Sequence, residues 1–166
     1  MLTTHIKLTI PKIPLLYPEQ AQGILRREVG TELTSLLEER ATIARQEARV
    51  GVSGLLRASV ATRITMGTDA SSLVRGTLFT GAQAPHAVYF AYGTRPHWPP
   101  RAPIELWTQR VLGNAKLWFV VARAISRRGT RAHPRFAAAF SITPAEVKPR
   151  LRAAVARAAR LISGGS

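Results

Sequence analysis

Apolar and polar positions repeat along the chain with two different periods. From about Glu19 to Glu47 the apolar residues recur every three or four positions, which predicts one long amphipathic helix. Residues 60–66 and 73–80 alternate one by one, so they predict two strands, and the turn-like segment 67–72 joins them into an antiparallel hairpin. Residues 1–18 predict an extended arm, because three prolines interrupt the second half of this segment.

Helical periods return in the second half of the chain. Pro103 favours the first position of a helix that ends at Gly113, and a second helix is predicted from about Ala115 to Arg128. Its inward positions are predicted to be Leu117, Val120, Val121, Ala124 and Ile125. Thr143, Pro144 and Glu146 form a capping box that begins a last helix. The run 87–92 is apolar on every side, so its period does not choose between a buried strand and a short helix.

These elements predict an α+β fold, in which a small antiparallel sheet packs against the long N-terminal helix and further helices and long loops follow. No linker is long enough to divide the chain. We therefore expect a single domain over residues 1–166, with an extended N-terminal arm at 1–18, a core at 19–162 and a tail at 163–166.

Charge changes this picture. Lys and Arg total 24 against 9 Asp and Glu, which gives a net charge of +15. Residues 1–94 hold ten basic and seven acidic side chains, a net of +3, whereas residues 95–166 hold fourteen and two, a net of +12. The C-terminal part therefore predicts contact with nucleic acid, an anionic surface or an acidic protein.

Catalytic and metal chemistry finds little support in the residues. The chain has no cysteine, one aspartate (Asp69), no phosphate-binding glycine motif and no paired histidines at metal-ligand spacing. A nuclease would need clustered carboxylates for divalent ions, and residues 95–166 contain only two. We therefore expect no enzymatic activity, no metal and no cofactor. No apolar run resembles a signal peptide or membrane span, so no membrane partner is expected either.

The C-terminal basic residues allow three interpretations. They can attract phosphate backbones without base specificity, face an acidic neighbouring subunit, or form a solvated surface in an arginine-rich protein. The residues concerned are Arg123, Arg127, Arg128, Arg135, Arg150, Arg152 and Arg157. Charge alone does not choose among these interpretations.

Two loops share a short motif. Gly93-Thr94-Arg95-Pro96-His97 recurs 36 residues later as Gly129-Thr130-Arg131-Ala132-His133, with unrelated flanking segments, so we interpret them as similar loops rather than a structural repeat. The first loop continues into the stiff, aromatic segment 96–101. Tryptophan, tyrosine and arginine are enriched at protein interfaces, so an interface role is favoured over base stacking.

The order of these motifs resembles a family of tailed-bacteriophage proteins. Ser53-Gly54-Leu55-Leu56-Arg57-Ala58-Ser59, the Tyr89–His97 segment, the tryptophan helix around Trp107 and the Gly129–Phe136 loop are similar in order and spacing to the head–tail joining, tail-completion or tail-terminator proteins of long-tailed phages. The resemblance covers about residues 20–160. Two positions depart from the pattern: Ala91 replaces an often acidic residue, which puts any salt bridge of that acid in doubt, and Ser53 replaces threonine.

The resemblance implies a structural virion protein that forms a ring, usually of six copies, at the neck or tail end of the particle. It implies neighbours above and below, namely connector or stopper proteins and the tail tube protein, with DNA passing through the channel. Such a protein assembles in the cytoplasm of the bacterial host. The joining and terminator roles share the pattern, so both stay open.

Under this interpretation the loops are interface elements and the basic residues lie in interfaces or near the DNA. The predicted interface residues are Ser53, Gly54, Leu55, Arg57, Gly93, Thr94, Arg95, His97, Trp98, Arg101, Gly129, Thr130, Arg131, His133 and Phe136. The alternative function is a non-sequence-specific nucleic-acid-binding protein that uses the C-terminal basic helices.

Overall fold

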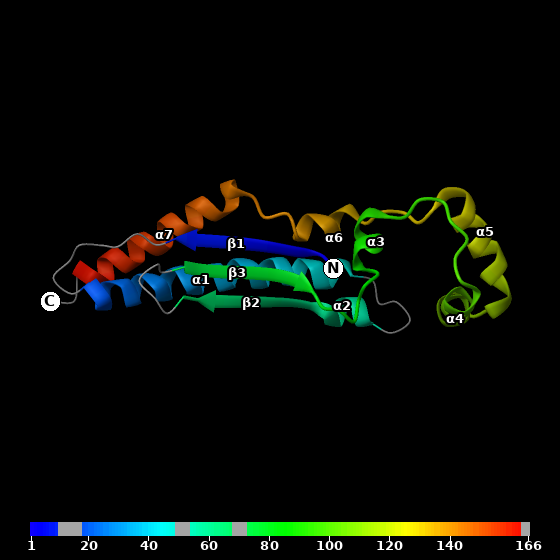
Figure 1. Cartoon of the computed structure of the whole chain (residues 1–166), viewed down its shortest axis with the longest axis horizontal. Helices are drawn as coiled ribbons and strands as arrows, with labels where there is room; N and C mark the ends of the chain where they lie inside the picture. The colour runs from blue at the N-terminus through cyan, green and yellow to red at the C-terminus, as the bar shows by residue number, and fades with distance from the viewer. Residues whose placement is uncertain (10–17, 49–53, 68–72, 164–166) are drawn as a thin grey trace. The chain divides into compact units, whose positions relative to one another are not determined.

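The computed structural model describes residues 1–9, 18–48, 54–67 and 73–163. It has the predicted mixed α+β composition (Figure 1). Its elements in chain order are β1 (Thr3–Thr9), α1 (Pro18–Glu47), α2 (Leu55–Ser59), β2 (Val60–Met66), β3 (Leu73–Thr80), α3 (Ala87–Tyr92), α4 (Arg101–Leu112), the 3-10 turn η1 (Ala115–Leu117), α5 (Trp118–Arg128), α6 (Pro134–Ala139) and α7 (Pro144–Ser163).

The long helix and the strands confirm the periodicity of the sequence. Helix α1 has nearly the predicted bounds, and β2 and β3 are neighbours in an antiparallel sheet. The predicted turn at 68–72, the segment 10–17 and the loop residues 49–53 lie outside the described residues. The sheet gains a third strand from the N-terminal arm, because β1 pairs antiparallel with β3 from Thr3 opposite Phe79 to Thr9 opposite Leu73.

Contacts cluster in two compact units, and the chain passes between them several times. The first unit holds residues 1–2, 43–60 and 80–139, and the second holds residues 3–42, 61–79 and 140–166. The expectation of a single domain stays a prediction.

The second unit is a sheet covered by helix α1 (Figure 1). Val74 and Leu78 of β3 and Leu33 and Leu37 of α1 are almost fully buried, so they form its apolar centre. A methyl group on Gly76 would lie 2.7 Å from Leu37 Cδ1, which shows that the missing side chain lets the helix approach the middle strand closely. The opposite face of β3, which carries the alternating residues Arg75, Thr77 and Phe79, is only partly buried.

Helix α7 runs antiparallel to α1 and is held there by ion pairs. Arg157 donates to Glu28 at 3.1 Å and to Glu32 at 2.7 Å, while Arg150 pairs with Glu32 and Glu39. At the start of α7, Glu146 pairs with Arg40. Ala154 and Ala158 are the buried positions of the helix, so small residues allow the two helices to pack closely. The predicted start at Thr143 is confirmed, with the Thr143 carbonyl accepting the Glu146 N–H at 3.1 Å.

The first unit is mostly helical. The apolar run 87–92 is the short helix α3, which settles the choice that its period left open. Leu55 and Arg57 were predicted as residues of an interface loop, but they belong to helix α2, which Gly54 precedes and in which Ser59 Oγ donates to the Leu56 carbonyl at 2.8 Å. Likewise, the segment expected to be a loop up to Phe136 contains helix α6. Both helices are too short to produce a helical period in the sequence.

Candidate interaction surface

The two Gly-Thr-Arg loops lie against each other. The Thr94 N–H donates to the Thr130 carbonyl at 3.3 Å, the Thr130 N–H donates to Thr94 Oγ1 at 3.0 Å, and the two hydroxyl oxygens are 3.1 Å apart. Each loop also ends a helix, because Gly93 N–H caps α3 at the Tyr89 carbonyl and Gly129 N–H caps α5 at the Ile125 carbonyl. The two similar motifs are therefore the two halves of one contact, which we call the loop pair (residues 93–95 and 129–131).

Glycine is required at both positions. Gly93 has φ 75° and ψ −177°, and Gly129 has φ 73° and ψ −166°, a region that only glycine adopts without strain. A Cβ on Gly93 would lie 2.5 Å from the Thr130 carbonyl oxygen, and one on Gly129 would overlap the Thr94 carbonyl oxygen. The backbones approach too closely for any side chain at these two positions.

An aromatic stack supports the second loop. The rings of Phe90 and His133 lie parallel with centroids 4.0 Å apart, and the edge of Phe136 meets Phe90 at 5.1 Å. The His133 N–H also donates to the Phe90 carbonyl at 3.1 Å. Phe136 was predicted as an interface residue, but it is fully buried within the chain, where its ring contacts Phe90.

The chain leaves the first loop and returns to the second through two helices joined by a turn, α4, η1 and α5, which we call the hairpin. Gly113 ends α4 in the left-handed conformation at φ 72°, as the sequence predicts. The buried Thr108 Oγ1 lies 2.9 Å from the Glu105 carbonyl oxygen and 3.3 Å from the Ala115 carbonyl oxygen, so its single proton is donated to this pair of acceptors, and Asn114 Oδ1 accepts the Lys116 N–H at 2.9 Å. These bonds fix the turn, so α4 and α5 form one structured hairpin rather than two independent helices.

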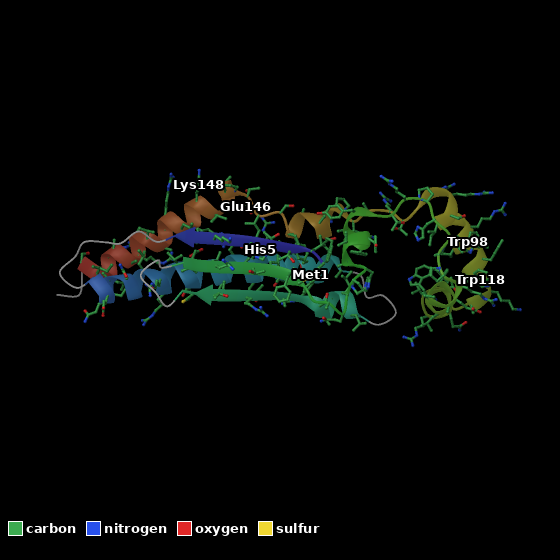
Figure 2. All side chains as sticks on the ribbon, viewed as in Figure 1. Met1, His5, Trp98, Trp118, Glu146 and Lys148 are labelled. Atoms are coloured by element: carbon green, nitrogen blue, oxygen red, sulfur yellow. The ribbon has the colours of Figure 1, made fainter. Side chains whose placement is uncertain are left out.

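Aromatic residues tie the entering loop to the hairpin. The ring centroids of Trp98 and Phe119 are 5.9 Å apart, and those of Phe119 and Trp118 are 5.7 Å apart. The Arg101 guanidinium carbon lies 4.7 Å from the centroid of the Trp118 ring. Arg101 also pairs with Glu105 at 3.0 Å. Figure 2 labels Trp98 and Trp118 at this hairpin. The predicted interface residue Arg101 is thus partly engaged inside the chain.

The outward side of the hairpin is apolar at many positions. Trp98 is 54% exposed, Phe119 49% and Val120 63%. Half of the fourteen large hydrophobic residues that the described chain exposes fall within residues 98–120: Trp98, Leu106, Val111, Leu112, Leu117, Phe119 and Val120. Concentrated exposure of this kind marks interaction surfaces.

This exposure corrects the predicted inward face of the second helix. Leu117, Val120 and Ala124 are exposed, whereas Val121 and Ile125 are partly buried and the fully buried residue of the helix is Ala122. Val111 of α4 is likewise an apolar residue that is 51% exposed. Helix α5 has more apolar residues than α4 can cover. Hydrophobicity alone therefore does not identify which of these residues are buried.

The predicted basic residues separate into two groups. Arg150 and Arg157 pair with glutamates of α1, and Arg135 lies 3.8 Å from Glu47, so these three charges are partly neutralised within the chain. Arg123, Arg127 and Arg128 are exposed on the last turns of α5, and Arg152 is exposed on α7. No local pattern in the sequence indicates this division, because the α1 glutamates lie more than a hundred residues from their α7 partners.

The hydrogen bonds of α7 also affect the pKa of one arginine. The hydrogen bonds to Glu32 and then Glu28 raise the pKa of the Arg157 guanidinium above its ordinary value. The side chain is therefore held in its charged form by the helix it contacts.

The remaining predicted loop residues lie in exposed positions or outside the described chain. Arg95 and His97 are exposed, and His97 Nδ1 lies 2.9 Å from the Arg95 carbonyl oxygen. Leu55 is 43% exposed and Arg57 is exposed on α2, while Gly54 precedes that helix. Thr130 and Arg131 are exposed at the loop pair. Ser53 lies outside the described residues.

Metal-binding clusters and membrane-spanning helices are not found in the described ranges. Within them, no three His, Asp or Glu side chains gather where they would bind a metal ion. No helix in the same part of the chain has the length and apolar character needed to cross a membrane. Comparisons of the chain with protein-family models, curated proteins and solved structures find no match. The candidate functional surface is the hairpin, because half of the exposed large hydrophobic residues of the described chain lie within residues 98–120, together with the loop pair that joins its two ends.

Proposed function

We propose that this chain is a structural subunit of a tailed-phage-like particle, which forms a ring at the head–tail interface or the tail end. The observation that carries the proposal is the exposed apolar and basic face of the α4–α5 hairpin, fixed to the rest of its unit by the loop pair. A rigid, aromatic and arginine-containing surface of this kind is typical of permanent protein–protein contacts. The motif order at residues 53–59, 89–97 and 129–136 adds the resemblance to neck and tail proteins.

The proposed mechanism is assembly without chemical turnover. Copies associate around the DNA channel, and the exposed loops and hairpin contact the proteins above and below. The division of the basic residues fits this role, because ion pairs within the chain hold α7 on α1 and leave the arginines of α5 available for a neighbour. A ring contact also accounts for apolar side chains that a free monomer would expose to water.

The test is the copy number and location of the protein in purified particles. Quantitative mass spectrometry counts the copies relative to the portal protein, and particle imaging locates them. We expect a small fixed number, consistent with a hexameric ring, at the neck or tail end. Absence from intact, DNA-filled particles would overturn the proposal.

The alternative, a nucleic-acid-binding protein, is favoured by the cluster of exposed arginines at 123, 127 and 128 on α5. It predicts that the free protein binds duplex DNA with an affinity that falls steeply with salt, because bound phosphates release their counterions. Substituting these arginines by glutamine would reduce the slope by about one for each phosphate that the variant no longer binds. Salt-independent or undetectable binding at about 50 mM salt would contradict it.

A further inference from the structure

The outward face of the α4–α5 hairpin has two parts along α5. Phe119 and Val120 expose an apolar first turn, Arg123 is exposed in the middle of the helix, and Arg127 and Arg128 expose a cationic last turn. Positions 119, 123 and 127 are spaced four residues apart, so one face of the helix runs from a phenyl ring to two guanidinium groups. A partner that covers this face must be apolar at one end and negatively charged at the other.

The hairpin contains many more basic than acidic residues. Residues 101–128 contain six basic side chains (Arg101, Arg110, Lys116, Arg123, Arg127 and Arg128) and one acidic side chain, Glu105, so the net charge is 6 − 1 = +5. Glu105 already pairs with Arg101 on the same helix. The carboxylates that complement the α5 arginines have to come from outside the hairpin.

A second copy of this chain offers few carboxylates for that purpose. Six of its nine acidic side chains take part in ion pairs within the chain: Glu28, Glu32, Glu39, Glu47, Glu105 and Glu146. A seventh, Glu38, accepts a hydrogen bond from Thr62. Recruiting the glutamates of α1 would break contacts that hold α7 in place, so charge complementarity favours a different polypeptide.

A phosphate backbone or a lipid surface matches only part of the face. Phosphates would satisfy the arginines but leave the aliphatic groups of Leu106, Val111 and Val120 in water, because these groups do not stack on bases as aromatic rings do. A membrane-surface helix buries one continuous apolar face and keeps its basic residues on the opposite one. Here Phe119 shares its face with Arg123 and Arg127, which fits a protein surface with an apolar centre and an acidic edge.

We infer that the α4–α5 hairpin docks, through Phe119, Val120, Arg123 and Arg127, on an acidic and partly apolar surface of a different polypeptide. The inference deepens the proposed function, on which it rests for the identity of that polypeptide as a neighbour in the particle. It assigns the partner by chemistry: carboxylates within reach of the last turn of α5 and an apolar pocket or groove at its first turn.

The experiment places a photo-crosslinking amino acid, benzoylphenylalanine, at position 120 of the full chain in cells that assemble particles. The matched control carries the same group at Val155 of α7, which is 48% exposed. After irradiation, mass spectrometry identifies the joined peptides. We expect position 120 to join a different polypeptide through a peptide of net negative charge, and position 155 not to join that peptide.

A charge-reversed variant supplies the second readout. Arg123→Glu with Arg127→Glu is expected to lower the yield of the position-120 adduct at least tenfold, while Arg152→Glu on α7 leaves it within twofold. Circular dichroism and the thermal midpoint of unfolding are measured on all variants. If the double glutamate variant does not fold, the double glutamine variant, Arg123→Gln with Arg127→Gln, takes its place. Unchanged adduct yield in a folded double variant would overturn the inference.

The remaining outcomes separate the inference from the proposed function. An adduct with a second copy of this chain, with nucleic acid or with lipid, or no adduct at either position in assembled particles, overturns the acidic partner even if the protein sits at the particle neck. An adduct with an acidic polypeptide, in a chain that is absent from finished particles, leaves the inference standing and removes the proposed function.

Discussion

Arginine and large apolar side chains have different surroundings in two regions of the molecule, the helix pair α1–α7 and the α4–α5 hairpin. Between α1 and α7 the arginines meet glutamates, and the large apolar residues of α1, such as Leu33 and Leu37, are buried. In the hairpin the arginines of α5 face outward and Phe119 and Val120 remain exposed. The difference shows that the net charge of +15 is a poor guide to function until the ion pairs are known. A fold can use arginine as internal packing in one region and as a surface for a partner in another.

The largest expected difference between the two regions is in the free energy of unfolding lost when an apolar side chain is shortened to alanine. Leu37→Ala deletes a fully buried side chain against Gly76 and is expected to lower the free energy of unfolding by about 2–5 kcal/mol. Val120→Ala, on the exposed face of α5, is expected to change it by less than about 0.5 kcal/mol. Urea unfolding followed by circular dichroism measures both. Equal losses would mean that the hairpin face is core in the free chain.

The next largest loss of stability is expected for a substitution in the loop pair. Gly129→Ala puts a methyl group against the Thr94 carbonyl in a backbone region that non-glycine residues avoid, so we expect a loss of about 1–3 kcal/mol of stability. The matched variant is Gly113→Ala, which has a similar φ of 72° but open space around its Cβ position. It is expected to lose roughly 1 kcal/mol from the left-handed backbone alone.

Limited proteolysis locates the damage of the Gly129 variant. We expect new cleavage within residues 95–128, because the loop pair closes that segment at both ends. A Gly129→Ala protein as stable and as resistant to protease as the Gly113→Ala protein would show that the loop pair does not hold the hairpin.

Two glycines of α1 sharpen the account of how the second unit packs. Gly23 has open space at its Cβ position, so Gly23→Ala is expected to stabilise the protein by about 0.5–1 kcal/mol through helix propensity. Gly30→Ala gains the same propensity but its methyl group would overlap the end of the Met66 side chain, so its gain is expected to be smaller. Thermal unfolding distinguishes them, and a larger gain at Gly30 would contradict the packing described.

The smallest expected effect concerns the ion pairs of α7. Arg157→Gln removes the contacts to Glu28 and Glu32 and is expected to lower the thermal midpoint slightly at low salt. Because the pKa of Arg157 is raised, the charged form that stabilises the fold is fully present below its ordinary pKa and is lost only in stronger alkali. Salt, rather than pH near neutrality, is therefore the variable to change.

The salt dependence has a matched control on the same helix. The difference between Arg157→Gln and the unsubstituted chain should shrink as ionic strength rises from about 0.01 to 1 M, because screening weakens the pair. Arg152→Gln, at an exposed position of α7, should show no such trend. A salt-independent loss at Arg157 would indicate that its packing, not its charge, holds the helix.

Local rules predicted the elements whose signals lie within a few residues. The bounds of α1, the strands β2 and β3, the start of α7 at Thr143 and the ends at Gly113 and Gly129 all follow from period, capping and glycine. Helices α2 and α6 were missed because five or six residues carry no period. The N-terminal arm was predicted to be extended, but its place as a strand beside β3 depends on a partner some seventy residues away.

The candidate surface was predicted only in part. Trp98, Arg123, Arg127 and Arg128 were named from composition and are exposed on the hairpin or its entering loop. Phe136 was assigned to the interface and is buried, and Val120 was assigned to the interior and is exposed. Both errors have the same cause. Hydrophobicity makes burial of a side chain favourable, but the tertiary contacts determine whether that side chain is buried.

The sequence by itself determined the local order of this protein: which segments are helical or extended, where glycine must end a helix, and that the positive charge lies in the C-terminal part. These properties depend on contacts between residues a few positions apart. Only the tertiary structure decided that the two Gly-Thr loops are one contact, that glutamates of α1 pair with Arg150 and Arg157 of α7, and that the α5 arginines are left exposed. Those properties depend on pairs of residues 36 to 129 positions apart, and no local pattern of charge or hydrophobicity specifies such partners.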